Sequence, residues 1–188
     1  MRVIAGTYRS RPLRSLPGLD LRPTSDRLRE TLFNVLTAGN PSALEGTVWI
    51  DLYAGTGAVG IEALSRGAVM VHFVESSAKA AELVNKNLKS LGAVANFEVL
   101  KQDAVRALRM LEAREVMPDV VFFDPPYRME EAYKLTLETL AESVLLKPQG
   151  MAIAEHDKRF DPGEEFGQLR RFRKLEQGDS ALSFYRNV

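Results

Sequence analysis

Short apolar segments of strand length alternate with amphipathic segments of helical period from residue 47 to residue 154. The first of these segments, residues 47–52, is mostly apolar, and a glycine-containing loop and a helical pattern ending at Arg66 follow it. The same order of strand, loop and helix then repeats along the chain. Parallel strands need long crossover connections, which are usually helical, so this alternation predicts a doubly wound, mostly parallel sheet with helices on both faces.

The remaining pattern extends this α/β arrangement. Further strands are expected at residues 69–74, 97–100, 120–123 and 151–154, and helices at residues 24–38, 77–91, 104–113 and 130–141. Near the C-terminus, two strand-like stretches at 169–175 and 182–185 are joined by Gln-Gly-Asp-Ser, a sequence typical of a hairpin turn. The sheet is therefore expected to finish with an antiparallel hairpin.

The N-terminal segment differs from the rest of the chain. Residues 1–16 are expected to form a short extended hairpin, too polar to contribute to the core. Residues 1–30 contain seven arginines, three acidic residues and no lysine. Arginine suits phosphate contact and base stacking, so we interpret residues 1–40 as an extension that contacts a nucleic acid and residues 41–188 as the catalytic domain. An ordinary solvated arm is the alternative.

Composition excludes several classes of protein. A chain of 188 residues is long enough for one full domain, and the lack of cysteine excludes disulfides, thiolate metal sites and cysteine nucleophiles. No apolar run approaches the roughly 20 residues that span a bilayer, which predicts a cytoplasmic protein without a membrane partner. The two histidines are His72 and His156, and His72 is expected to pack within a strand, so no metal site is predicted.

The loop between the first strand and its helix is expected to bind a ligand. Asp51 ends the strand, and the sequence Leu-Tyr-Ala-Gly-Thr-Gly-Ala-Val-Gly follows it up to Gly60. In a doubly wound sheet, ligands bind outside the carboxyl ends of the strands, where glycines let the backbone approach and helix amides donate hydrogen bonds.

Two ligand classes fit this loop. Gly55, Gly57 and Gly60 match the dinucleotide fingerprint, and Glu75 lies where an acid holds a ribose hydroxyl, so a dehydrogenase is one interpretation. Asp51 favours another, because its carboxylate can accept from a cationic amine, and S-adenosylmethionine has such an amine and no phosphate. Asp103, after the third strand, could accept from an adenine amine; both Glu75 and Asp103 could equally be solvated strand ends.

The strand at 120–123 brings Asp124, Pro125, Pro126 and Tyr127 to the same edge. The prolines fix φ, and the Pro125 carbonyl is expected to be free to accept. The two N–H groups of a base amine match this carbonyl and Asp124, while Tyr127 offers a π-face for the base. The two motifs together predict methyl transfer to an exocyclic amine of a nucleic-acid base, with positioning and charge placement supplying most of the rate.

With these motifs and the segment Arg-Pro-Thr-Ser-Asp-Arg-Leu-Arg-Glu at residues 22–30, the chain resembles the RsmD family of bacterial 16S ribosomal RNA guanine-N2 methyltransferases. The resemblance also includes the opening Arg-Val-Ile-Ala-Gly at residues 2–6 and covers nearly the whole length. It implies a class I methyltransferase fold with a seven-stranded sheet, S-adenosylmethionine as cofactor, S-adenosylhomocysteine as product, and a guanine of small-subunit ribosomal RNA as target. The RNA would lie in an assembled or assembling subunit.

The resemblance also implies roles for particular residues. The expected cofactor site comprises Asp51, Tyr53, Ala54, Gly55, Thr56, Gly57, Glu75, Asp103 and Ala104. The expected catalytic residues are Asp124, Pro125, Pro126 and Tyr127, which would hold a flipped guanine. The candidate RNA contacts are Arg9, Arg22, Arg27 and Arg29, although Arg27 could instead only be solvated or pair along its helix.

Two further functions stay open at this point. The Asp-Pro-Pro-Tyr turn suits any exocyclic amine, so an adenine-N6 or cytosine-N4 DNA methyltransferase is the enzymatic alternative, although the chain has little room for a DNA recognition domain. A non-catalytic ribosome assembly factor is the alternative from another class, and the intact acids of both motifs speak against it.

Overall fold

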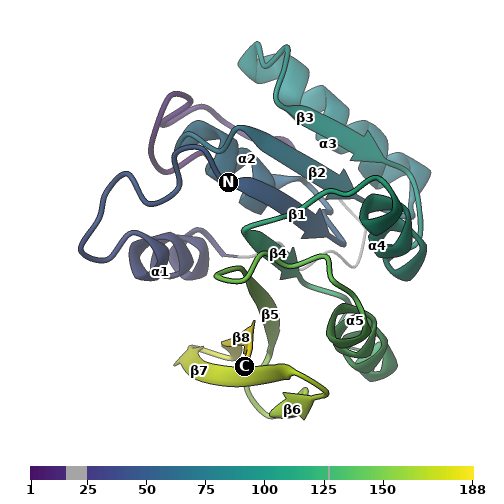
Figure 1. Cartoon of the computed structure of the whole chain (residues 1–188). Coiled ribbons are helices and arrows are strands. Elements are labelled where there is room, and N and C mark those ends of the chain that lie inside the picture. The colour runs from purple at the N-terminus through teal and green to yellow at the C-terminus, as the bar shows by residue number, and fades with distance from the viewer. Residues whose placement is uncertain (16–24, 127) are drawn as a thin grey trace.

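One twisted sheet forms the centre of the molecule (Figure 1). The computed structural model describes residues 1–15, 25–126 and 128–188. The strands are β1 (Val48–Leu52), β2 (Met70–Val74), β3 (Phe97–Leu100), β4 (Val120–Phe123), β5 (Met151–Asp157), β6 (Glu165–Phe166), β7 (Leu169–Gln177) and β8 (Ser180–Asn187). Their order is β3-β2-β1-β4-β5-β8-β7-β6, in which β1 to β5 are parallel and the last three are antiparallel.

Helices cover both faces of the sheet. They are α1 (Asp26–Leu36), α2 (Ala58–Ser65), α3 (Ala78–Leu91), α4 (Ala104–Ala113) and α5 (Glu130–Glu142). Side chains of α1, α2 and α3 share one apolar cluster with Trp49, Phe73 and Phe122, whereas α4 and α5 pack on the other face against Ile50 and Phe123. Among the described residues, no helix combines the length and the apolar character that crossing a bilayer requires.

The doubly wound, mostly parallel sheet with an antiparallel C-terminal hairpin is confirmed, but the expected strand number of seven is wrong. Among the described residues the sheet has eight strands, because Glu165 and Phe166 pair with Arg170 and Leu169 and add β6 at the edge. A strand of two residues carries no alternating pattern, so its sequence gives no periodic signal. Its pairing depends on the neighbouring strand.

Capping side chains explain where the helices α1, α3 and α4 begin. The Ser25 hydroxyl accepts from the Leu28 amide at α1, and Ser77 caps α3 in the same way. At α4 the Asp103 carboxylate accepts from the amides of Val105 and Arg106. Each cap satisfies amides that have no acceptor within the helix, so the bounds follow short polar residues that the sequence displays.

The expectation that the N-terminal segment is too polar for the core is wrong. Val3 and Leu13 are 1% and 6% exposed and belong to the apolar cluster beneath α1 to α3. An isolated bridge between Arg2 and Pro12 closes the segment into a bend. Two apolar side chains among many polar ones therefore anchor the segment in the core.

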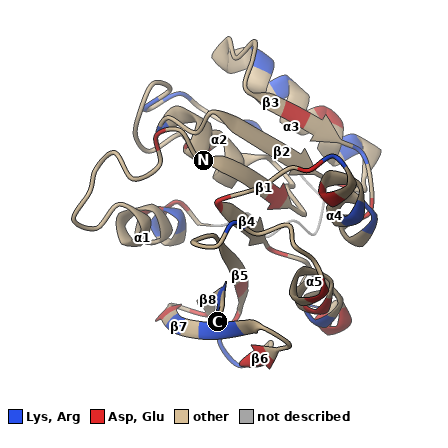
Figure 2. Ribbon diagram, viewed as in Figure 1, with Lys and Arg blue, Asp and Glu red and all other residues tan. Residues whose placement is uncertain are grey.

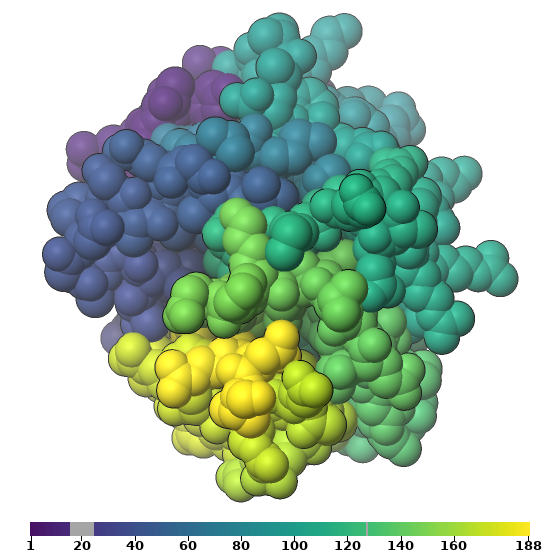
Figure 3. Space-filling model, in the orientation of Figure 1, coloured from purple at the N-terminus to yellow at the C-terminus, as the bar shows by residue number. Residues whose placement is uncertain are grey.

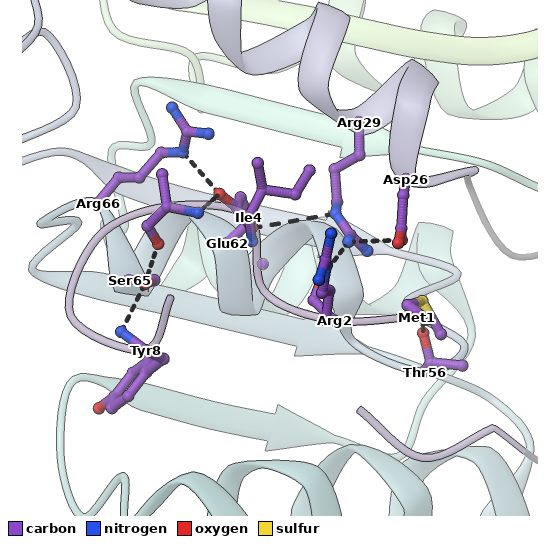
Figure 4. Close-up of polar contacts among 12 residues, drawn as sticks. Met1, Arg2, Ile4, Tyr8, Asp26, Arg29, Thr56, Glu62, Ser65 and Arg66 are labelled. Atoms are coloured by element: carbon purple, nitrogen blue, oxygen red, sulfur yellow. Dashed lines mark hydrogen bonds and ion pairs between the residues drawn. The ribbon is translucent and has the colours of Figure 1, made fainter. Parts of the chain in front are cut away.

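Polar groups of α2 hold this segment in place (Figure 4). The Glu62 carboxylate accepts from the Ile4 and Ala5 amides at 2.8 and 3.0 Å. The Ser65 hydroxyl accepts from the Tyr8 amide at 2.9 Å and donates to the Ala5 carbonyl at 2.5 Å. One turn of helix therefore satisfies the backbone of a segment that makes few ladder hydrogen bonds of its own.

Gly6 lies where this segment meets α2. Its φ is +78°, and a Cβ there would lie 1.7 Å from the Ser65 carbonyl oxygen. We expect Gly6→Ala to lower the free energy of unfolding by more than about 2 kcal/mol, measured by urea denaturation. Gly39→Ala is the matched control, since Gly39 has a φ of +79° and nothing within 4 Å, and it should cost only the backbone strain of about 1 kcal/mol. Equal losses would show that the contact with Ser65 is unimportant.

Candidate active site

A cavity of about 840 Å³ opens at the carboxyl edge of the parallel strands. Its volume falls within the range typical of pockets for small molecules and cofactors. Of the residues expected in the site, those that line it are Asp51, Tyr53, Ala54, Gly55, Thr56, Glu75, Asp103, Ala104, Asp124, Pro125 and Pro126. The topology thus brings residues from the ends of β1, β2 and β4 and from the start of α4 to one cavity.

The loop after β1 turns sharply to enter α2. Tyr53, Gly55 and Gly57 all have positive φ, at +58°, +56° and +76°. Such backbone is strained for tyrosine, and strain of this kind is common at ligand sites. Gly57 does not line the cavity; a Cβ there would lie 3.2 Å from Val84 and 3.4 Å from Phe73, so this glycine serves packing.

Asp51 is buried at the end of β1, with an exposed fraction of 2%. Its carboxylate accepts from the Gly60 amide at 2.9 Å in the first turn of α2. Burial raises the pKa of Asp51 from 3.8 to about 8; the bond from Gly60 opposes this shift, and Glu75 adds to it. An acid in such a site gains strongly from a cationic ligand, which would favour its charged form.

Glu75 supports the same loop from β2. Its carboxylate accepts from the Gly55 amide at 3.0 Å and from the Ser77 amide at 2.8 Å. It is 8% exposed and lines the cavity, so it both orders the backbone around the ligand space and presents acceptor capacity to it. Asp103 is exposed, and its Oδ1 caps α4 through Val105 and Arg106, which leaves Oδ2 for a ligand.

The turn after β4 forms another wall of the cavity. Asp124 is partly buried, Pro125 is buried and Pro126 is exposed. The expectation that the Pro125 carbonyl is free needs a correction, because the Tyr133 hydroxyl lies 3.2 Å from it and 3.0 Å from the Glu155 carbonyl. A hydroxyl has one proton and a carbonyl has two lone pairs, so Pro125 retains capacity for a second donor. Tyr127, the aromatic residue of the motif, lies outside the described residues.

The candidate RNA contacts separate into exposed and buried side chains. Arg9 and Arg27 are exposed, and Arg27 lines a second pocket of about 250 Å³. Arg22 lies outside the described residues. The expectation for Arg29 is wrong: it is 0% exposed, and its guanidinium donates to the Arg2 carbonyl and to Asp26.

Arg29 has a structural role, because its guanidinium connects α1 to Glu62 of α2. Its Nε lies 4.0 Å from a Glu62 carboxylate oxygen, and Glu62 is also fully buried. Burial lowers the pKa of Arg29, while Asp26 and Glu62 raise it. Across the described chain, basic and acidic residues are interspersed (Figure 2), in keeping with a net charge of zero.

Sequence reasoning missed several residues that line the cavity. Two of them are Ala58 and Val59, at the start of α2. The geometry of a helix start leaves their backbone amides without acceptors within the helix. The others that line it are Val74, Ser76, Ser77, Gln102, Val105, Phe122, Arg128, Met129, Glu131, Ala132 and Leu135. The loops directly after β2 and β3 could have been found from the rule that strand ends bind ligands, whereas the wall from α5 depends on packing.

No group of three or more histidine, aspartate or glutamate side chains suited to a metal ion occurs in the part of the chain that the structure describes. His72 is buried in β2, and its Nδ1 lies 3.1 Å from a Glu98 carboxylate oxygen. Burial lowers the pKa of His72, and the Glu98 contact opposes this shift. This is the environment of a packed histidine.

A family model described as "Conserved hypothetical protein 95" matches residues 1–186. Ribosomal RNA small subunit methyltransferase D of Haemophilus influenzae is 36% identical over 159 residues, which cover 84% of this chain and 79% of that protein. The chain belongs to the RsmD family. A proposed rRNA methyltransferase of Bacillus subtilis is 37% identical over 186 residues, covering 99% of this chain and 98% of its own.

Solved structures agree with this membership of the RsmD family. A structure from Escherichia coli, described as a proposed methyltransferase, has a TM-score of 0.80 and 31% identity, with 100% of this chain and 97% of that chain covered. A proposed RNA methyltransferase from Pyrococcus horikoshii has a TM-score of 0.71 at 21% identity and covers 94% of this chain and 91% of that chain, so it supports the fold alone. The class I methyltransferase fold expected from the resemblance is confirmed.

The raised pKa of Asp51 predicts a pH-dependent stability for the ligand-free protein. Between pH 4 and pH 8 the folded state binds the Asp51 proton and the unfolded state releases it. The stabilisation of the fold by this proton is therefore complete below pH 3.8, the unfolded pKa, and is lost as the pH rises to about 8, the folded pKa. Asp51→Asn keeps the acceptor without the charge. We expect its stability relative to the native chain to increase from pH 5 to pH 8, by on the order of a few kcal/mol, measured by urea unfolding at both pH values.

Asp161→Asn is the control, because the pKa of Asp161 is shifted in the direction opposite to that of Asp51. The Arg171 guanidinium holds the pKa of Asp161 below its ordinary value, so its charge stabilises the fold above the unfolded pKa. Because the Asp161 side chain is half-exposed, its removal should cost under about 1 kcal/mol at both pH values. A relative stability of Asp51→Asn that does not change with pH would contradict the assignment of a neutral Asp51.

Proposed function

We propose that this protein transfers the methyl group of S-adenosylmethionine to the exocyclic N2 amine of a guanine in 16S ribosomal RNA of the small subunit. The observation that carries the proposal is that the glycine loop after β1 and the Asp-Pro-Pro turn after β4 line one cavity. The relatives in the RsmD family, named as methyltransferases of small-subunit ribosomal RNA, support RNA over DNA as substrate.

The residues around the glycine loop fit the chemistry of this cofactor. The buried Asp51 carboxylate suits the ammonium group, and the amides of Ala58 and Val59 suit the carboxylate at the same end of the molecule. Glu75 is suited to the ribose hydroxyls, and Asp103 to the adenine amine. The cofactor supplies an electrophilic methyl group on a sulfonium, so the protein need only bind, orient and exclude water.

The turn after β4 would act on the target amine. Its nitrogen is a poor nucleophile because its lone pair is delocalised into the ring. Asp124 and the remaining lone pair of the Pro125 carbonyl would accept its two N–H groups and favour a pyramidal nitrogen that faces the methyl. As the N–C bond forms and the S–C bond breaks, the nitrogen gains positive charge; Asp124 stabilises that charge and takes the proton that leaves. Tyr127 completes the proposed set by stacking on the base.

The RNA would be held by the N-terminal part of the chain. We propose residues 1–40 as the RNA-contacting extension and residues 41–188 as the catalytic domain, with the exposed Arg9 and Arg27, and Arg22, as contacts to phosphates or bases. Arg29 is not part of this set because it is buried. An assembled or assembling small subunit would supply further surface, which a protein of zero net charge needs more than a basic one.

Nucleoside analysis tests the proposed reaction. The protein is incubated with labelled S-adenosylmethionine and free 16S RNA, unmethylated small subunits or DNA, and the labelled nucleoside is then identified. We expect label in N2-methylguanosine from RNA or subunits. Label in N6-methyladenine or N4-methylcytosine of DNA would support the alternative enzyme, and binding to subunits without any transfer would support an assembly factor.

Replacing Asp124 tests the role of the turn. We expect Asp124→Ala to reduce kcat at least about 100-fold, because it removes both an acceptor and a charge beside the developing positive nitrogen. Binding of S-adenosylmethionine, measured by calorimetry, should change less than about threefold, within about 0.7 kcal/mol. Asp124→Asn keeps one acceptor and should retain more activity than the alanine variant. Normal turnover by Asp124→Ala would contradict the proposed role.

A further inference from the structure

A second buried acid lies beside the proposed target site. Glu155 is in β5, and its exposed fraction is 2%. Glutamate is among the residues least often fully buried, and the sequence patterns did not single this one out. Glu155 lies next to the Asp-Pro-Pro turn, so it could take part in recognition of the target base, a role that rests on the proposed function.

The register of the sheet brings Glu155 beside Asp124. Phe122 pairs with Ile153, and both belong to the cluster under α1 to α3; Phe123 pairs with Ala154, and both belong to the opposite cluster. Side chains alternate along strands, and paired strands lie about 4.8 Å apart. The register ends at the pair Phe123 and Ala154, and Asp124 and Glu155 directly follow that pair in their chains. Because β5 continues to Asp157, alternation places Glu155 on the same side as Ile153.

A buried hydroxyl ties the two backbones together. Tyr133 is 1% exposed, and its hydroxyl lies 3.2 Å from the Pro125 carbonyl and 3.0 Å from the Glu155 carbonyl. The turn that would hold the target amine therefore has a fixed position relative to Glu155. A fixed spacing is what the recognition of two neighbouring atoms of one rigid base requires.

Glu155 lines the second pocket, of about 250 Å³. Ser25 and Arg27 from the start of α1 and residues 177–180 of the β7–β8 hairpin form its other walls. Figure 3 shows these two parts of the chain, in blue and yellow, side by side on the surface. The volume of this pocket is below the roughly 300–1,000 Å³ that is typical of sites for drug-sized molecules.

Guanine presents three donors on one edge, at N1 and at the two hydrogens of N2. Asp124 and Pro125 account for the N2 hydrogens in the proposed reaction, which leaves N1–H without an acceptor. Adenine has an acceptor at its N1, and cytosine has one at N3, so a carboxylate at this point repels either base and accepts from guanine. Enzymes that flip a base read it by hydrogen bonds along this edge.

We infer that Glu155 accepts the N1–H of the target guanine and thereby makes the site specific for guanine over other amine-bearing bases. Asp124 and Glu155, at the carboxyl ends of adjacent strands, then share one base: the former holds the reacting amine and the latter reads the neighbouring ring nitrogen. The exposed Arg27 lines the same pocket as Glu155 and would supply a cation to the phosphate of the same nucleotide.

A base analogue and an isosteric variant test the inference together. Unmethylated small subunits are reconstituted with RNA carrying either guanine or 2-aminopurine at the target position; 2-aminopurine keeps the N2 amine but has an acceptor at N1. The native protein should have a kcat/KM about 100-fold lower on 2-aminopurine, since a site built to accept a hydrogen bond rejects an analogue without the donor. Glu155→Gln can donate to that acceptor, so the ratio should fall to about one or invert.

Calorimetric binding of S-adenosylmethionine verifies that Glu155→Gln is folded, and Glu82→Gln, an exposed residue of α3, is the matched control that should keep the native ratio. If Glu155→Gln methylates guanine and keeps the 100-fold preference, the inference is overturned and the proposed function stands. Should that variant not fold, equal rates of the native protein on the two bases overturn the inference as well. A native protein that methylates neither RNA contradicts the proposed function itself.

Discussion

The hydrogen bond between the Gly60 amide and the Asp51 carboxylate connects the end of β1 to the first turn of α2. It depends on close packing, because a Cβ on Gly60 would lie 2.4 Å from a ring carbon of Phe73 in β2. Only glycine lets the helix lie this close to the sheet. The contact fixes the helix start relative to the sheet edge, so the Asp51 carboxylate and the free amides of α2 face the same cavity.

The other end of α2 carries the N-terminal segment. Glu62 is fully buried and accepts from two backbone amides of that segment and from Arg66, while Arg29 of α1 lies close by. A buried carboxylate requires several donors of this kind to offset its loss of hydration. At the start of the chain, the Met1 sulfur lies 3.8 Å from the Thr56 hydroxyl at the cavity. A single short helix therefore connects the glycine loop, the arginine-rich segment and α1.

Four acids lie at or near the carboxyl ends of adjacent strands of the sheet, and their surroundings divide them into pairs. Asp51 and Glu75 accept backbone amides of the glycine loop and of the turn after β2, and they serve the half of the cavity that we assign to the methyl donor. Asp124 follows β4 and lines the half that we assign to the base, whereas Glu155 lies in β5 and lines the second pocket. The proposed selectivity arises because parallel strands with the same register deliver side chains to one edge at fixed spacing.

The sequence by itself determined the alternation of strands and helices, the antiparallel finish and the two motifs at one edge, because apolar periodicity, capping residues and glycine or proline turns act over a few residues. Only the tertiary structure decided which polar residues are exposed. Arg27 and Arg29 are two positions apart on α1, yet the first is exposed and the second is buried against Glu62, a residue from a different helix. Glu155 gained its place beside Asp124 in the same way, through strand pairing between residues far apart in the chain. Local patterns do not encode such pairings, since they depend on which surfaces the whole fold brings together.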